Sequence, residues 1–393
     1  MKVLLVANNL REGGAAVGAN NLLKSLEAVG HEVIAVDKYY DPGIKGMLLR
    51  LVRNIERFIE KIFFFKEEDA HFIKIYKSTL KLKWLVDTYQ PDVIQLGFVA
   101  GNIIDFRELS VIDLPIVMRI SDFWPFTGPF HYPVGYLECN DSGFRLWLAD
   151  RLLKQHLDLD NFRKVHFVAP SKWSFELLSG LIGRERCCTY IPNAVHVNEE
   201  ESICRVSHAT VDLSTVAVRV VVVAGDLSEP RKGVNLFIMF LTNALKYNSL
   251  NWVVTLVGSN GAQFEQLSMG SRLIVKAVGR LSKNEVLRLI SKNHFLACPS
   301  LLDNSPNVVC EALAQGVPII CQSGTGSASY VKDGCSGLIF DFTCSNADSV
   351  ISFSRRLLSI DYSAARLNAF NCAKDYSFNT IGRHYTRLYE QLK

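Results

Sequence analysis

The amino-acid sequence predicts an α/β protein made of two doubly wound halves, each with a parallel sheet between layers of helices. Its length of 393 residues exceeds what one compact core usually holds, so two domains are expected. Two apolar runs of similar design, residues 2–7 and 219–224, each precede a glycine-containing loop and a helical segment. Apolar runs without polar interruption are typical of strands that are buried on both faces of a parallel sheet.

The first half alternates strands and helices from its first residues. Residues 2–7 are expected to form a buried strand and not a signal peptide, because the apolar run is short and Asn8 and Asn9 follow it. The loop Arg11-Glu12-Gly13-Gly14 comes next, and a helix is expected from about Ala16 to Val29. Further strands are expected at His31–Val36, Val93–Leu96, Ile116–Ile120 and Val165–Ala169.

The second half repeats this order. After the strand Arg219–Ala224, a loop runs to Gly233 and a helix is expected through Lys246. Further strands are expected at Trp252–Val257, Leu273–Ala277, Phe295–Cys298 and Pro318–Cys321. The polar stretch Asn193–Thr215 separates the halves, so we expect domains at 1–192 and 193–376, followed by an amphipathic helix at 377–393.

Composition narrows the class of protein. Apolar residues make up 49% of the chain and charged residues 21%, as in soluble globular proteins. The net charge is only +4, which gives no reason to expect a nucleic-acid partner. The ten cysteines include no CxxC pair, so we expect free thiols and a cytoplasmic location. No apolar stretch approaches the length of about 18 residues that a membrane-spanning helix needs.

The most informative segment is Pro299–Gly316, with the sequence PSLLDNSPNVVCEALAQG. We expect a loop that carries Asp303, then a helix of about ten residues that contains Glu311, with Ser305 as its N-cap and Pro306 at its first position. A helix N-terminus at such a turn offers free N–H groups that favour a phosphate. The amides of Asn307, Val308 and Val309 are the expected donors. Two carboxylates beside a phosphate site suit a nucleotide sugar.

This segment resembles the donor-site signature of the retaining GT-B glycosyltransferases of family 4. In that family an acidic residue is followed by seven others, Glu and Ala, and here these positions are Asp303, Glu311 and Ala312. The resemblance implies that Asp303 holds hydroxyls of the transferred sugar and Glu311 the ribose. It also implies a GT-B fold, in which two Rossmann-like domains face a central cleft and the C-terminal helix crosses back to the first domain.

Two basic residues and two glycines are expected to bind the diphosphate. Arg231 and Lys232 precede Gly233, and fixed cations in such a loop would stabilise the charge of a departing nucleoside diphosphate. Gly13 and Gly14 would let a phosphate or sugar approach the backbone of the first loop. By resemblance, Arg280 and Leu281 lie near the nucleobase.

The segment after the strand Ile116–Ile120 departs from the family. Relatives often carry His-Asp where this chain has Ser121 and Asp122, and their histidine contacts the transferred sugar. Serine forms hydrogen bonds but does not hold a proton near neutral pH. Together with His131, these residues are the expected sugar or acceptor contacts. A retaining enzyme with front-face attack needs no protein base, because a leaving-group phosphate oxygen takes the proton.

We therefore expect a retaining hexosyltransferase of bacterial surface polysaccharide (capsule or exopolysaccharide) synthesis, with a nucleotide-sugar donor, a glycan or lipid-linked acceptor, and no cofactor. The triplet Asp158-Leu159-Asp160 fits a charged loop better than a metal site, so no metal is expected. The amphipathic stretch Lys45–Lys66 fits two interpretations, contact with an anionic membrane surface on the cytoplasmic side or packing on its own sheet. Two other functions stay open, a catalytically silent nucleotide-sugar-binding protein and an NAD-dependent enzyme, although no first loop reads GxGxxG.

Overall fold

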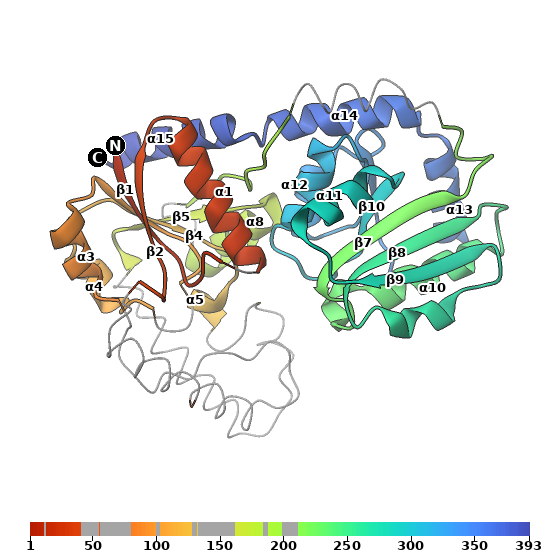
Figure 1. Ribbon diagram of the computed structural model, residues 1–393, viewed down its shortest axis with the longest axis horizontal. Helices are drawn as coiled ribbons and strands as arrows, with labels where there is room; N and C mark the ends of the chain where they lie inside the picture. Colours follow the sequence, from red (N-terminus) through yellow and green to blue (C-terminus); the bar gives the residue numbers. More distant parts are fainter. Residues whose placement is uncertain are drawn as a thin grey trace. The chain divides into compact units, whose positions relative to one another are not determined.

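The computed structural model describes residues 1–11, 13–40, 55, 80–99, 103–127, 132, 162–183, 188–198 and 211–393. Within these ranges the chain divides into two compact units, Met1–Pro192 with Ile381–Lys393, and Asn193–Thr380. Each unit contains a six-stranded parallel sheet with helices packed on it (Figure 1). The predicted α/β class with two Rossmann-like halves is confirmed.

The first unit has the strand order β2-β1-β3-β4-β5-β6. In chain order its elements are β1 (Lys2–Val6), α1 (Gly14–Ala28), β2 (Glu32–Val36), α3 (Leu82–Tyr89), β3 (Val93–Leu96), α4 (Arg107–Val111), β4 (Ile116–Arg119), α5 (Trp124–Thr127), β5 (Val165–Ala169), α8 (Lys172–Ile182) and β6 (Cys188–Tyr190). The bounds predicted for β3 and β5 are confirmed, and β6 is a strand that the sequence did not predict.

The second unit has the strand order β12-β11-β10-β7-β8-β9. Its elements are β7 (Val218–Asp226), η2 (Pro230–Lys232), α10 (Val234–Ala244), β8 (Trp252–Ser259), η3 (Ala262–Leu267), β9 (Leu273–Gly279), α11 (Lys283–Ser291), β10 (Phe295–Cys298), α12 (Asn307–Ala314), β11 (Ile319–Gln322), η4 (Gly326–Tyr330), β12 (Gly337–Phe340), α13 (Ala347–Leu358) and α14 (Tyr362–Lys374). After β7, the chain adds β8 and β9 on one side of that strand and then β10, β11 and β12 on its other side. The boundary between β7 and β10 is therefore the topological switch point of the sheet.

Burial on both faces of the second sheet explains why its strands are largely apolar, as in the run Val220–Val223 of β7. Val220 and Val222 of β7 join the core beneath α10 and α13, whereas Val221 joins the core on the α12 and α14 side. Side chains alternate between faces along a strand, so only a continuous apolar run fills both cores.

The last helix, α15 (Phe378–Leu392), carries the chain into the first unit from Ile381 onward. Its buried side chains include Tyr385, Leu388 and Tyr389. The Tyr389 hydroxyl donates to Gln95 Oε1 of β3 at 2.7 Å. The C-terminal residues are therefore part of the core of the N-terminal unit.

Several predictions fall outside the described residues. These are His131, the triplet 158–160 and, apart from Ile55, the amphipathic stretch 45–66. None of the helices in the described ranges is long and apolar enough to cross a membrane.

Candidate active site

A charged pair lies at the switch point of the second sheet, where the loops that follow β7 and β10 meet. Lys232 Nζ contacts Asp303 Oδ2 at 2.8 Å, and the two side chains are only 17% and 14% exposed. These residues are far apart in the sequence, and both were predicted as site residues. In open α/β sheets, ligands bind at the carboxyl ends of the strands at such a point.

Backbone contacts fix the two loops against each other. The Leu301 N–H donates to the Arg231 carbonyl at 2.7 Å. Gly233 follows with a φ of 64°, and a Cβ there would lie 2.1 Å from the Pro299 carbonyl oxygen. Only glycine fits that position, so the glycine of the RKG sequence allows the close approach that brings Lys232 to Asp303.

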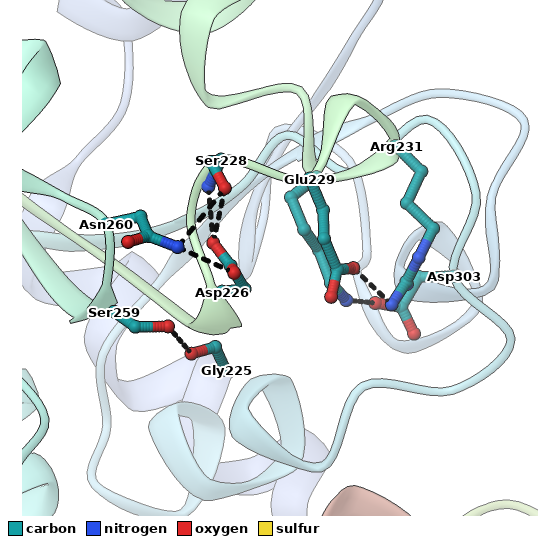
Figure 2. Close-up of polar contacts among 9 residues, drawn as sticks. Gly225, Asp226, Ser228, Glu229, Arg231, Ser259, Asn260 and Asp303 are labelled. Carbon is teal, nitrogen blue, oxygen red and sulfur yellow. Dashed lines mark hydrogen bonds and ion pairs between the residues drawn. The ribbon is translucent and has the colours of Figure 1, made fainter. Parts of the chain in front are cut away.

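Arg231 has a different partner from the one expected. Its guanidinium forms an ion pair with Glu229, two residues earlier (Figure 2). The two adjacent cations therefore have different kinds of partner. Lys232 pairs with Asp303 of a distant loop, whereas Arg231 pairs with Glu229 of its own turn. A diphosphate would have to share Arg231 with Glu229.

The N-terminus of α12 is built differently from the prediction. The helix begins at Asn307, its N-cap is Pro306, and the N-cap makes no side-chain hydrogen bond, so the prediction of Ser305 as N-cap is wrong. The Ser305 hydroxyl instead bonds the Tyr330 hydroxyl, a contact from η4 that local sequence does not reveal. Asn193 Nδ2 donates to the Ser305 carbonyl at 2.9 Å and further anchors the turn.

The three predicted amide donors of α12 are not equivalent. The Val309 N–H donates to the Pro306 carbonyl at 3.1 Å, so it is already bonded. The Val308 amide lies in the first turn, where an α-helix supplies no acceptor. Gly326 packs against the loop that carries Asp303. Its N–H donates to the Asp303 carbonyl at 2.9 Å, and a Cβ at this position would lie 1.8 Å from the backbone carbonyl oxygen of Asn304.

Glu311 lies further along α12, with its side chain 10% exposed. Its carboxylate forms an ion pair through Oε1 with Lys283, the first residue of α11. No local motif marks Lys283 in the sequence, because only the tertiary structure brings α11 to α12.

A second polar cluster, also missed from the sequence, follows β7 and β8 (Figure 2). Asp226 accepts from the Ser228 hydroxyl at 2.6 Å and from Asn260 Nδ2 at 2.8 Å. The hydrogen bonds from Ser228 lower the pKa of the Asp226 carboxyl, and the charge of Arg280 adds to this effect. Arg280, predicted to lie near the nucleobase, contacts Ser259 Oγ at 3.4 Å, and Leu281 is partly buried against the α12 core.

Apart from His131, which lies outside the described residues, the remaining predicted residues belong to the first unit, at the carboxyl ends of β1 and β4. Gly13 is the N-cap of α1 with a φ of 94°, and Gly14 is the first helical residue. Ser121 Oγ accepts from the buried Arg119 at 3.0 Å, and Asp122 Oδ1 accepts from the Trp124 amide at 3.3 Å. The structure describes the two units separately, so a cleft that joins these residues to Lys232 and Asp303 stays a prediction.

Comparisons with known proteins agree with this architecture. Residues 218–359 match the family described as Glycosyl transferases group 1. Sucrose-phosphate synthase from Thermosynechococcus elongatus has the same fold, with a TM-score of 0.65, 14% identity, and coverage of 100% of this chain and 98% of that one. HepE from Anabaena, solved with UDP-glucose, has a TM-score of 0.56, 16% identity and full coverage of both chains.

WaaG, a glycosyltransferase involved in lipopolysaccharide biosynthesis, has a TM-score of 0.57 and 14% identity over 99% of each chain. No curated protein matches the chain in sequence. The chain therefore has the GT-B fold, with two Rossmann-like units and a charged site at the switch point of the second. Within that fold, the match to the group 1 glycosyl transferases lies wholly in the second unit.

Proposed function

We propose that this glycosyltransferase moves a hexose from a nucleotide diphosphate sugar to a hydroxyl of a glycan or lipid-linked glycan, with retained configuration and without a metal. We place this reaction in the synthesis of bacterial surface polysaccharides, on the cytoplasmic side of the membrane. The observation that carries the proposal is the Lys232–Asp303 pair, at the switch point of the unit that matches the group 1 family.

The site residues have distinct roles in this reaction. The Lys232 ammonium, already held and largely shielded from water, stabilises charge on the diphosphate as the bond from the sugar C1 to the phosphate oxygen breaks. Asp303 accepts hydrogen bonds from sugar hydroxyls, and Glu311 accepts them from the ribose. The acceptor oxygen bonds to C1 on the face that the phosphate leaves, and its proton passes to a phosphate oxygen.

The first donor to test is UDP-glucose, because HepE from Anabaena was solved with that compound. Release of nucleoside diphosphate should be measured from UDP-, GDP- and ADP-sugars, with and without EDTA. We expect release from one donor, unchanged by EDTA, and a loss of at least about a hundredfold in Glu311→Ala. Binding of no donor by calorimetry would overturn the proposal, and full activity in Glu311→Ala would overturn the assigned site.

A catalytically silent nucleotide-sugar-binding protein is the second candidate. Ser121 favours it, because this hydroxyl is bonded to Arg119 and stands where relatives often have histidine. The silent protein would bind a donor in calorimetry but release no diphosphate with any acceptor. If the wild type releases no diphosphate and Ser121→His does, the silent protein is the correct candidate.

A further inference from the structure

The contact between Glu311 and Lys283 assigns a role to a residue outside the predicted site. The Glu311 side chain is 10% exposed, and its neighbours Cys310 and Ala312 are buried in the core on that face of the sheet. Lys283 approaches from outside this core, with its side chain 51% exposed. A half-exposed lysine thus extends to a nearly buried carboxylate.

The position of Lys283 on α11 is unfavourable by local rules. It is the first helical residue, where the helix dipole favours negative side chains and disfavours cations. The acidic residue of that turn, Glu285, accepts a hydrogen bond through Oε2 from the Ser282 amide at 2.8 Å, as part of a capping box. Lys283 therefore does not serve the helix, and residues that break a local rule often serve a functional site.

Only one oxygen of Glu311 is used by this ion pair. Lys283 contacts Oε1, and Oε2 has no partner among the residues that the structure describes. A carboxylate with one oxygen fixed by a cation presents its second oxygen in a defined direction. That second oxygen can accept a hydrogen bond from a ligand hydroxyl without displacing the lysine.

We propose that Lys283 is a positioning residue for Glu311, which fixes Oε1 so that Oε2 accepts a hydrogen bond from a ribose hydroxyl of the donor nucleotide. The proposal rests on the proposed function, since it takes Glu311 as the ribose contact. It predicts that Lys283 contributes to selection of ribose over deoxyribose and acts only through Glu311.

The test measures binding by calorimetry of UDP, GDP and ADP, each beside its 2′-deoxy and 3′-deoxy forms. For the base that binds, we expect the wild type to prefer ribose over at least one deoxy form by about tenfold or more, as for a hydrogen bond to a charged acceptor. Lys283→Met should weaken binding of the ribose form about tenfold and leave the deoxy form unchanged. Lys283→Arg should keep most of the preference.

Two controls separate positioning from a general effect of charge or folding. Lys292→Met removes an exposed cation at the other end of α11 and should leave the preference intact. In a Glu311→Gln background, Lys283→Met should change ribose binding little, since residues that act as one unit are not additive. If Lys283→Met unfolds, Lys283→Gln takes its place in the same series.

The outcomes distinguish this inference from the proposed function. Binding of none of the nucleotides by the wild type would end both. Nucleotide binding with an unchanged ribose preference in Lys283→Met would overturn the role of Lys283 alone. Equal weakening of the ribose and deoxy forms would also overturn it, because that pattern reports a loss of charge attraction and not a positioned carboxylate.

Discussion

At the scale of single residues, Lys232 is the side chain on which the proposed chemistry depends most. Its ammonium is held by Asp303 in a shielded site, where a fixed charge is worth far more than in water. We expect Lys232→Ala to lower kcat by at least about a hundredfold in steady-state assays of diphosphate release. Lys246→Ala, an exposed cation after α10, is the matched control and should keep full activity.

His294 makes the stability of the second unit depend on pH. Burial is the main reason that its pKa is lowered from 6.5 to about 4, and the charges of Arg219 and Arg366 add to this effect. Its Nδ1 accepts from the Arg219 amide at 3.1 Å, so the folded state holds the neutral ring. The unfolded state binds a proton below its pKa of 6.5, so stability is present above that pH and is lost as the pH falls towards about 4.

We therefore expect the free energy of unfolding of this unit to fall by about 2 kcal/mol more in the wild type than in His294→Asn between about pH 7.5 and pH 5. Asparagine keeps an acceptor near the position of Nδ1 but does not titrate. Urea unfolding curves of both proteins at the two pH values measure this difference. Parallel losses in the two proteins would show that other groups control the acid sensitivity.

At the scale of elements, the turn η2 matters because it brings the β7 loop against the β10 loop. Alanine at Gly233 would combine a φ of 64° with a Cβ only 2.1 Å from the Pro299 oxygen. The turn would have to move, and Lys232 would move away from Asp303. We expect Gly233→Ala to lower the free energy of unfolding by about 2 kcal/mol and diphosphate release by about tenfold or more.

Gly225→Ala is the control for this change. Gly225 is on the neighbouring part of β7, its φ is not in the left-handed region, and a Cβ there would meet no heavy atom within 4 Å. Thermal unfolding and diphosphate release of both variants should be compared with the wild type. Equal effects of the two substitutions would refute the argument from close packing at Gly233.

The elements also show why part of the structure could be predicted from sequence. The bounds of β3, β5 and β10 match the prediction because every residue in them is buried, so each strand is marked by a mostly apolar run, interrupted only by Gln95 in β3 and His166 in β5. The edge strands β6 and β12 were missed, since they are short and only partly buried. A strand of three or four residues that is exposed in part is too short to give a periodic signal.

Of the candidate site, only the residues that belong to a local sequence motif could be predicted. Asp303, Glu311 and Lys232 stand at motif positions, but their partners depend on distant segments. Ser305 had the right chemistry for an N-cap, yet its hydroxyl bonds the hydroxyl of Tyr330, 25 residues away, and Pro306 is the N-cap. Lys283 reads as an ordinary surface lysine until α11 is packed beside α12.

At the scale of the whole molecule, the two ends of the chain meet in one unit. The strand β1 opens the first sheet, and residues 381–393 of α15 complete the core of the same unit. The contact of Lys393 Nζ with Asp92 at 3.0 Å extends this arrangement to the last residue. The first unit therefore completes its core only with the end of the chain.

Two tyrosines of α15 allow this closure to be tested with matched substitutions. Tyr389 and Gln95 are both fully buried and bonded to each other at 2.7 Å, so Tyr389→Phe leaves the Gln95 Oε1 acceptor without its donor. The Tyr385 hydroxyl is also buried but has no hydrogen-bond partner among the described residues. Burial raises the pKa of Tyr385 to about 12, so this hydroxyl stays neutral at ordinary pH.

We expect Tyr389→Phe to lower the free energy of unfolding of the first unit by about 1–3 kcal/mol, the cost of an unsatisfied buried acceptor. Tyr385→Phe removes an already unpaired hydroxyl and should be neutral or slightly stabilising. Urea unfolding of both variants checks the contrast, because the two changes delete the same atom from neighbouring turns of one helix. A loss in Tyr389→Phe no larger than that in Tyr385→Phe would mean that the hydrogen bond to Gln95 of β3 does not hold the C-terminal helix on the first unit.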